Sequence, residues 1–144
     1  LHLVLPLDRA ADFDAVRKFA RQAADLLAGR HPQELTTEVR KNKRRGRLYL
    51  DVQRNAYAQT GVAPYSVRAR PHAPVATPLD WEELADHAVG PRHWNLRTVP
   101  DRLTSHGDPW SGVFRRGHSL TAAGRRLAQL AREEAPRTGS EEQS

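Results

Sequence analysis

The sequence predicts an α+β fold, with strand patterns in a basic first half and a helical appendix at the end. Apolar residues alternate with other residues over 1–5 and 48–52, a spacing typical of β-strands. Over 13–27 and 120–134 they recur every three or four positions, as on one face of an amphipathic helix. With 144 residues and 38% hydrophobic content, the chain can form one modest packed domain.

The first two elements are a strand over residues 1–5, which Pro6 ends, and a helix that begins after Asp12. Aspartate is a favourable N-cap because its carboxylate accepts hydrogen bonds from unpaired backbone N–H groups. Gly29 is placed to end the helix. The apolar face of this helix comprises Phe13, Val16, Phe19, Ala20, Ala23, Leu26 and Leu27.

A second strand is expected over residues 48–52, where apolar residues alternate with Tyr49 and Asp51. The two-residue period of a strand puts Asp51 on the face opposite the leucines. Residues 62–70 are expected to form a third extended segment. The prolines that keep the next stretch extended are Pro71, Pro74 and Pro78.

The second half is expected to be helical. Asp80 begins a short helix, since Glu83 stands three residues further on, as in a capping box. Pro100 suits the first turn of another helix. A last helix covers residues 120–134, with Leu120, Leu127, Leu130 and Ala131 facing inward. The polar tail over residues 136–144 is predicted to be disordered.

Positive charge is concentrated in the first half of the chain. The net charge is +6; residues 1–70 hold 14 basic and 7 acidic side chains, and residues 71–144 hold 9 and 10. The densest run comprises Arg40, Lys41, Lys43, Arg44, Arg45 and Arg47. Such a run is often only a solvated face, but this one adjoins a strand, and Arg54 and Arg68 flank the next segments. Binding of a nucleic acid or a nucleotide is therefore favoured.

Composition excludes several classes of site. The chain has no cysteine, so disulfides and thiolate metal sites are ruled out. No apolar run approaches the roughly 20 residues that span a bilayer, so a soluble cytosolic protein without a membrane partner is expected. The histidines show no metal-ligand spacing, and no P-loop is found. A chain without methionine also looks like the C-terminal part of a longer protein.

Asp51 has two readings. A carboxylate on a strand can bind Mg²⁺ or Mn²⁺, but such ions need further oxygen ligands, and no second acid stands near it in sequence. The alternative is an aspartate at a strand edge, paired with a neighbouring arginine. Spacing alone favours the second reading.

Three segments resemble the C-terminal half of the polymerase domain of bacterial DNA ligase D, a family of the archaeo-eukaryotic primase superfamily. They read LHLVLPL at 1–7, EVRKNKRRGRLYLDVQRNAYAQTGVAPYSVRARPHAPVATPLDWEEL at 38–84, and WNLRTVPDRL with DPW between 94 and 110. The resemblance implies that residues 1–110 form that half of a primase-polymerase fold, with a mixed or antiparallel sheet flanked by helices. Residues 111–135 would be a helical extension and residues 136–144 a tail.

The resemblance changes the reading of Asp51, which matches the third of three aspartates that hold two divalent metals, Mn²⁺ or Mg²⁺, in the family. His2, Arg44 and Arg68 match nucleotide-site residues, and Arg54 lies at a nearby position of that site. The residues that would contact DNA are Arg40, Lys41, Lys43, Arg45 and Arg47. The other two aspartates and a Ser/Lys nucleotide loop have no match here, so the isolated chain is expected to be inactive.

The function implied is nucleotide addition by a DNA polymerase or primase during non-homologous end joining, in the bacterial cytoplasm at the nucleoid. Implied partners are gapped or broken DNA ends, nucleoside triphosphates, a Ku-like end-binding protein and a ligase. The alternative is a nucleic-acid-binding module with a degenerate, non-catalytic polymerase fold.

Overall fold

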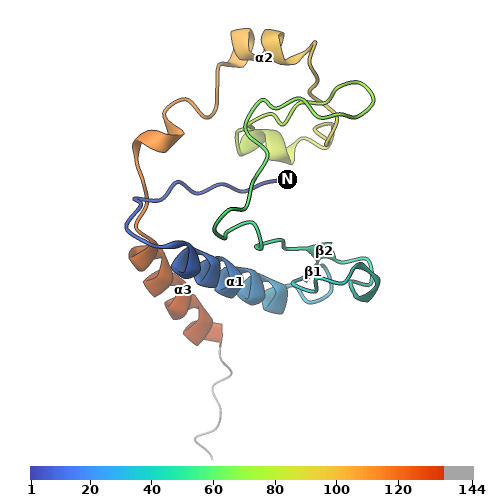
Figure 1. Cartoon of the computed structure of the whole chain (residues 1–144). Helices are drawn as coiled ribbons and strands as arrows, with labels where there is room; N and C mark the ends of the chain where they lie inside the picture. Colours follow the sequence, from blue (N-terminus) through green and yellow to red (C-terminus); the bar gives the residue numbers. More distant parts are fainter. Residues whose placement is uncertain (135–144) are drawn as a thin grey trace, which may run out of the picture. The chain divides into compact units, whose positions relative to one another are not determined.

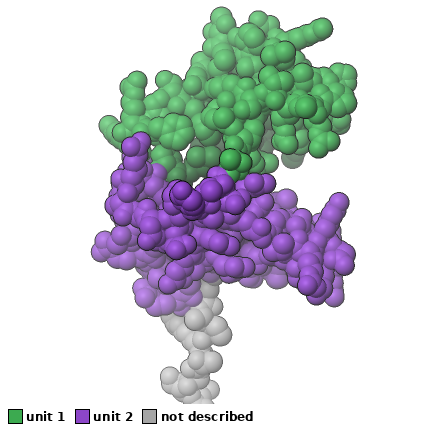
Figure 2. Space-filling model, in the orientation of Figure 1, with its two compact units in different colours: residues 1–6, 60–116 green, residues 7–59, 117–144 purple. Residues whose placement is uncertain are grey.

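The computed structural model describes residues 1–134, which divide into two compact units (Figure 2). Unit 1 comprises residues 1–6 and 60–116. Unit 2 comprises residues 7–59 and the segment from 117 onward. The tail predicted to be disordered, residues 136–144, lies outside the described residues. No helix in the described part of the chain has the length and apolarity needed to cross a membrane.

Two helices, α1 (Phe13–Arg30) and α3 (Leu120–Glu134), pack together in unit 2 (Figure 1). Both were predicted from their apolar spacing. The Asp12 carboxylate accepts a hydrogen bond from the Ala15 backbone N–H at 2.7 Å, which confirms the predicted N-cap. Helix α1 continues one residue past Gly29, and the His31 N–H closes it by donating to the Leu27 carbonyl at 3.0 Å.

A two-stranded parallel sheet of β1 (Leu35–Thr36) and β2 (Leu48–Tyr49) completes unit 2. Leu35 pairs with Leu48, and the Leu48 N–H donates to the Glu34 carbonyl at 2.7 Å. The 3₁₀ turn η1 (Lys41–Lys43) lies in the connection. Strand β2 lies within the predicted strand but is shorter, and its partner β1 was not predicted because two residues are too few to display a strand period.

The expected mixed or antiparallel sheet is wrong: within residues 1–134 the named strands form one parallel pair. Antiparallel pairing is limited to the isolated bridges Val67–Val75 and Pro74–Asn95. The strand predicted over residues 1–5 is also wrong, and its leucines are exposed, Leu1 by 98% and Leu3 by 79%. Alternation marks a segment that suits a sheet, but a strand forms only against a hydrogen-bonding neighbour.

Unit 1 is built mainly from turns and extended segments, with the helix α2 (Val99–His106). The predicted third extended segment pairs locally with the proline-rich stretch: the Tyr65 N–H donates to the Ala76 carbonyl at 2.8 Å, and the Arg68 N–H to the Pro74 carbonyl at 2.8 Å. The short 3₁₀ helices are η2 (Glu82–Ala85) and η3 (Val113–Arg115).

The helix expected after Asp80 is thus the single 3₁₀ turn η2, and half of its capping box is formed. The Asp80 backbone N–H donates to Glu83 Oε2 at 2.8 Å, but the N-cap of η2 is Trp81, and it makes no side-chain cap. Pro100 does lie in the first turn of α2, as predicted.

Few side chains are buried in the described residues. The buried apolar residues are Ala24 in unit 2, and Pro74, Val75, Pro78 and Val99 in unit 1. On α3 the three leucines predicted to face inward are half-buried, whereas Ala131 is exposed, contrary to prediction. The apolar faces are therefore only partly covered within each unit.

Gly117 is the most tightly packed glycine. A Cβ atom at this position would lie 2.6 Å from the backbone of Leu7 and Asp8, which pairs with the chain at His118. Gly117→Ala should therefore lower the free energy of unfolding of unit 2 by about 1–3 kcal/mol, because backbone atoms must move apart. Far-ultraviolet circular dichroism during urea unfolding would measure this change, since α1 and α3 lie in unit 2.

Gly124→Ala is the matched control for this prediction. Nothing lies within 4 Å of a Cβ built at Gly124, which is inside α3. Alanine should there raise the free energy of unfolding by about 0.5–1 kcal/mol through its higher helix propensity. Equal effects of the two substitutions would contradict the close approach at Gly117.

Candidate functional site

The basic run forms a tight turn between β1 and β2. Within it, Arg45 and Gly46 adopt left-handed backbone angles, with φ of 51° and 79°. The Arg47 N–H donates to the Arg44 carbonyl at 3.0 Å and closes the turn before β2 begins. The side chains exposed to solvent are those of Arg40, Lys41, Lys43 and Arg45. The turn therefore presents four cationic groups on one short segment.

Arg44 is held more firmly than its neighbours. Its Nε donates to the Glu38 carbonyl at 3.0 Å, and its Nη2 donates to the Val39 carbonyl at 2.7 Å. Its guanidinium also stacks over the Tyr49 ring, 4.0 Å from the centroid. These contacts fix the guanidinium plane, and they occupy only two of its five N–H groups. Arg44 is thus a pre-positioned cation with donors to spare.

Arg47 serves the turn itself. Its Nε donates to the Arg44 carbonyl at 3.0 Å, and its Nη1 donates to the Pro32 carbonyl at 3.3 Å. The charge remains, but these bonds tie the side chain to the backbone.

Asp51 follows β2 and is exposed. Its Oδ1 accepts a hydrogen bond from the Gln53 backbone N–H at 3.1 Å, which closes a small turn and orients the carboxylate. Asp51 therefore does not point into packed side chains. Arg54, in the loop that follows, is exposed as well.

The structure places the predicted site residues on two units. The segment from Arg40 to Arg54, with Arg44 and Asp51, belongs to unit 2. His2 and Arg68 belong to unit 1, and both are exposed.

The metal expected from the resemblance has one carboxylate of this chain to bind. Carboxylate oxygen is the right donor for Mg²⁺ or Mn²⁺, but such sites usually combine several oxygen ligands. Within residues 1–134 no three His, Asp or Glu side chains gather in a group that could hold a metal ion. The Asp51 carboxylate is thus the right type of ligand for Mg²⁺ or Mn²⁺, but one carboxylate does not complete a metal site.

A small hollow that no sequence pattern predicted lies beside β2. It has a volume of about 40 Å³ and is lined by Arg17, Arg21, Thr37, Val39, Tyr49, Leu50, Val52 and Gln53. The two arginines come from α1, four residues apart, and so from one helix face. The four-residue spacing of these arginines is the feature of the sequence from which a cationic site here could have been predicted.

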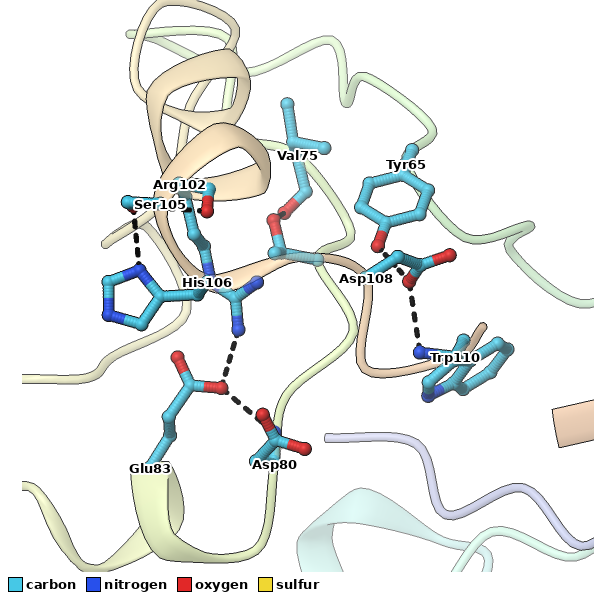
Figure 3. A network of polar contacts seen from close by, with 10 residues as sticks. Tyr65, Val75, Asp80, Glu83, Arg102, Ser105, His106, Asp108 and Trp110 are labelled. Carbon is cyan, nitrogen blue, oxygen red and sulfur yellow. Dashed lines mark hydrogen bonds and ion pairs between the residues drawn. The ribbon is translucent and has the colours of Figure 1, made fainter. Parts of the chain in front are cut away.

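Unit 1 contains a buried polar network around Arg102 (Figure 3). Arg102 is 3% exposed, and its Nη2 pairs with Glu83 Oε2 at 2.5 Å. Its guanidinium lies 5.1 Å from the centre of the Trp94 ring. The same Glu83 oxygen accepts the Asp80 N–H. Arg102 thus ties α2 to η2, and its role is structural.

A second pair in this unit joins distant parts of the chain: the Tyr65 hydroxyl donates to Asp108 Oδ1, which also accepts the Trp110 N–H at 2.9 Å (Figure 3). Burial, and next the hydrogen bond to Asp108, raise the pKa of Tyr65 above its ordinary value of 10.0. The same bond, followed by the Trp110 N–H, lowers the pKa of Asp108.

Because folding raises the pKa of Tyr65, its contribution to stability is complete below pH 10.0 and is lost as the pH rises above that value. The free energy of unfolding of Tyr65→Phe should therefore fall less steeply above pH 10 than that of the parent. Urea unfolding below and above pH 10, followed by tryptophan fluorescence, would measure it, and Tyr57→Phe in unit 2 is the control. An unchanged alkaline decline in Tyr65→Phe would contradict the assignment.

Residues 1–110 match the sequence pattern of the family described as LigD, primase-polymerase domain. The chain belongs to this family. The match spans Asp51, the basic turn and the Arg102 network.

Curated relatives and a solved structure agree with this assignment. The multifunctional non-homologous end joining protein LigD of Pseudomonas aeruginosa is 37% identical over 128 residues, which cover 88% of this chain and 15% of that protein. The LigD protein of Mycolicibacterium smegmatis is 38% identical over 108 residues, covering 75% and 14%. The polymerase domain from Mycobacterium tuberculosis ligase D, solved in complex with DNA, matches with a TM-score of 0.71 and 29% identity.

The chain is much shorter than these LigD proteins. It spans 15% of the Pseudomonas protein and 39% of the solved polymerase domain, whose match covers 78% of this chain. The family assignment therefore concerns a part of a polymerase domain, and the architecture is a mixed α/β one that resembles it.

Proposed function

We propose that this chain is part of a metal-dependent nucleotidyltransferase that extends broken or gapped DNA during non-homologous end joining. The observation that carries the proposal is an exposed carboxylate, Asp51, on the same short segment as the pre-positioned Arg44 and the exposed basic turn, within a region that matches the LigD polymerase family. The relatives' names give the reaction context, and the solved relative was in complex with DNA.

In this proposal Asp51 is one of three metal ligands. When bound, Mn²⁺ or Mg²⁺ would activate the primer hydroxyl and neutralise the leaving pyrophosphate. The part of this chain in that chemistry is to present one oriented carboxylate: the bond from the Gln53 N–H fixes Oδ1 and leaves the acid in solvent reach. In this proposal the chain is the C-terminal half of the polymerase domain, and the other two carboxylates would come from the rest of that domain.

Arg44 would bind the triphosphate of the incoming nucleotide. A guanidinium held by two carbonyls and an aromatic ring loses little freedom on binding, so its charge acts at a fixed place. His2, Arg54 and Arg68 are proposed as further nucleotide contacts. The DNA backbone would be held by Arg40, Lys41, Lys43, Arg45 and Arg47, the last mainly through its position in the turn.

The remaining parts of the proposal concern organisation. Residues 1–110 are assigned to the polymerase domain and residues 111–135 to a helical extension of it. A Ku-like end-binding protein and a ligase are proposed partners, since the reaction must be followed by sealing of the strand. The protein would act in the bacterial cytoplasm, at the nucleoid.

The experiment is a primer-extension assay on a gapped duplex with the complete polymerase domain that includes this chain. Extension should require Mn²⁺ or Mg²⁺ and stop when a chelator removes the metal, because Asp51 can act only through a bound cation. The 144-residue chain alone should not extend the primer. Extension that persists in excess chelator would contradict metal dependence, and extension by the isolated chain would contradict the incomplete site.

A second candidate function is a non-catalytic module that only binds DNA. The observation that favours it is the exposed basic turn with Arg40, Lys41, Lys43 and Arg45, which suits a DNA backbone without any chemistry. The two functions differ in one result: a binding module would hold DNA in a salt-sensitive way but incorporate no nucleotide, even within the complete domain.

A further inference from the structure

One face of α1 carries an aromatic ring and two arginines in line. Phe13, Arg17 and Arg21 are each four residues apart, so they share a face of the helix. Each step of four residues advances about 6 Å along the axis, comparable with the separation of successive phosphates in an extended strand. Asp25, the next residue at this spacing, reverses the charge and ends the series. We call Phe13, Arg17, Arg21 and Tyr57 the α1 strip.

The aromatic end of the strip is open to solvent. The rings of Phe13 and Tyr57 meet edge to face, with centroids 5.8 Å apart and planes at 79°. Phe13 is 56% exposed and Tyr57 79% exposed. An aromatic pair usually contributes by burying its area, which this pair does not do. Its open ring faces are suited to a planar ligand.

The cationic end of the strip lies over the hollow beside β2. Arg17 and Arg21 line it together with Tyr49 and Gln53. Among the described residues neither arginine has an ion pair or hydrogen bond, so both retain all their donors. With a volume of about 40 Å³, the hollow admits a group of a few heavy atoms, such as a phosphate. Arg44 of the basic turn stacks on the ring of Tyr49, which also lines the hollow.

We propose that the α1 strip binds single-stranded polynucleotide, with a base against the Phe13–Tyr57 pair and phosphates at Arg17 and Arg21. Aromatic faces beside cationic groups suit an unpaired strand, because duplex bases are already stacked and cannot reach the rings. This inference rests on the proposed function only in taking DNA as the substrate. It adds a binding track for an unpaired strand, such as an overhang, apart from the basic turn.

The test uses the 144-residue chain and a fluorescein-labelled oligothymidine, with binding followed by anisotropy over a range of salt concentrations. Arg17→Gln combined with Arg21→Gln should weaken binding about fivefold or more and make the salt slope shallower by about 1.4, since each phosphate contact on a single strand contributes about 0.7. The matched control is Arg125→Gln with Arg126→Gln, which removes the same charge from exposed positions of α3 in the same unit.

The aromatic contact is tested with Phe13→Leu and Tyr57→Leu together, which keep apolar side chains but remove both rings. The parent should bind an abasic oligonucleotide of the same length about fivefold more weakly than oligothymidine, whereas the double variant should bind both equally. If the rings instead serve contact with another protein segment, both proteins will discriminate alike, and the inference is overturned. Circular dichroism of each variant confirms that α1 is intact.

Failure here and failure of the proposed function give different results. If primer extension by the complete domain fails but the Arg17 and Arg21 substitutions still weaken strand binding, the α1 strip stands without the polymerase. If extension succeeds, and the Arg17 and Arg21 double variant binds the single strand as well as the Arg125 and Arg126 control does, the α1 strip is overturned and the proposed polymerase function stands.

Discussion

Asp51→Asn in the complete polymerase domain is expected to lower nucleotide incorporation by on the order of 100-fold or more. Even residues that only support a metal ligand typically affect metal affinity or activity 10- to 100-fold, and a ligand itself should matter more. Asparagine keeps the oxygen that accepts the Gln53 N–H, so the local turn should persist and only the negative charge is lost. Primer extension on a gapped duplex at fixed Mn²⁺ measures the effect.

Asp8→Asn provides a close control for this substitution. Asp8 is also exposed, lies in unit 2, and accepts the N–H of Ala10, two residues on, at 3.1 Å, in the same arrangement as Asp51 with Gln53. The Asp8→Asn substitution removes the same charge from the same kind of turn. Nucleotide incorporation by this variant should therefore stay near that of the parent. Equal activity of the two variants would refute a metal role for Asp51.

The Arg102–Glu83 pair should respond asymmetrically to loss of either partner. Glu83→Leu is expected to lower the free energy of unfolding of unit 1 by about 3 kcal/mol or more, since it leaves a buried guanidinium without its counter-ion. Arg102→Met is expected to cost about 1–2 kcal/mol. Methionine fills part of the space and removes two buried donors, Nε and Nη1, that have no hydrogen-bond partner within the described residues.

What remains after each change explains the difference. In Arg102→Met the Glu83 side chain, 23% exposed, can be hydrated and still accepts the Asp80 N–H. In Glu83→Leu the side chain of Arg102, 1% exposed, keeps its charge beside the Trp94 ring with little access to water. Tryptophan fluorescence during urea unfolding reports on this unit, because Trp81, Trp94 and Trp110 all lie within it. A larger cost for Arg102→Met would contradict the account.

The helices could be predicted because their signals are local. The Asp12 cap, the apolar spacing of α1 and the pattern of α3 each depend on residues within a few turns, and the observed bounds differ from the expected ones only at the end of α1. The strand pattern at residues 1–5 failed for the opposite reason, since pairing depends on a neighbour that the sequence of the segment does not reveal. The same applies to β1, which exists only through its bonds to β2.

The residue types of the candidate site could be read from the sequence, but the contacts that hold each side chain could not. Charge density located the basic turn, and the resemblance selected Asp51, which follows β2. Neither showed that Arg44 would be fixed by the Glu38 and Val39 carbonyls, nor that Arg102, within WNLRTVPDRL, would be buried. Arginines look alike in a sequence, and only their surroundings divide them into ligand-binding and structural groups.

Unit 2 is discontinuous in the chain, and this affects its folding during synthesis. Helix α1 ends at Arg30, but its partner α3 begins only at Leu120. At ribosomal rates of about 5–20 residues per second, about 4.5–18 s pass between the end of α1 and the start of α3. Because most helix stability in proteins comes from packing, the nascent α1 depends on its cap and on its contact with β1 until α3 emerges, and the part of its apolar face that α3 covers stays open to chaperones.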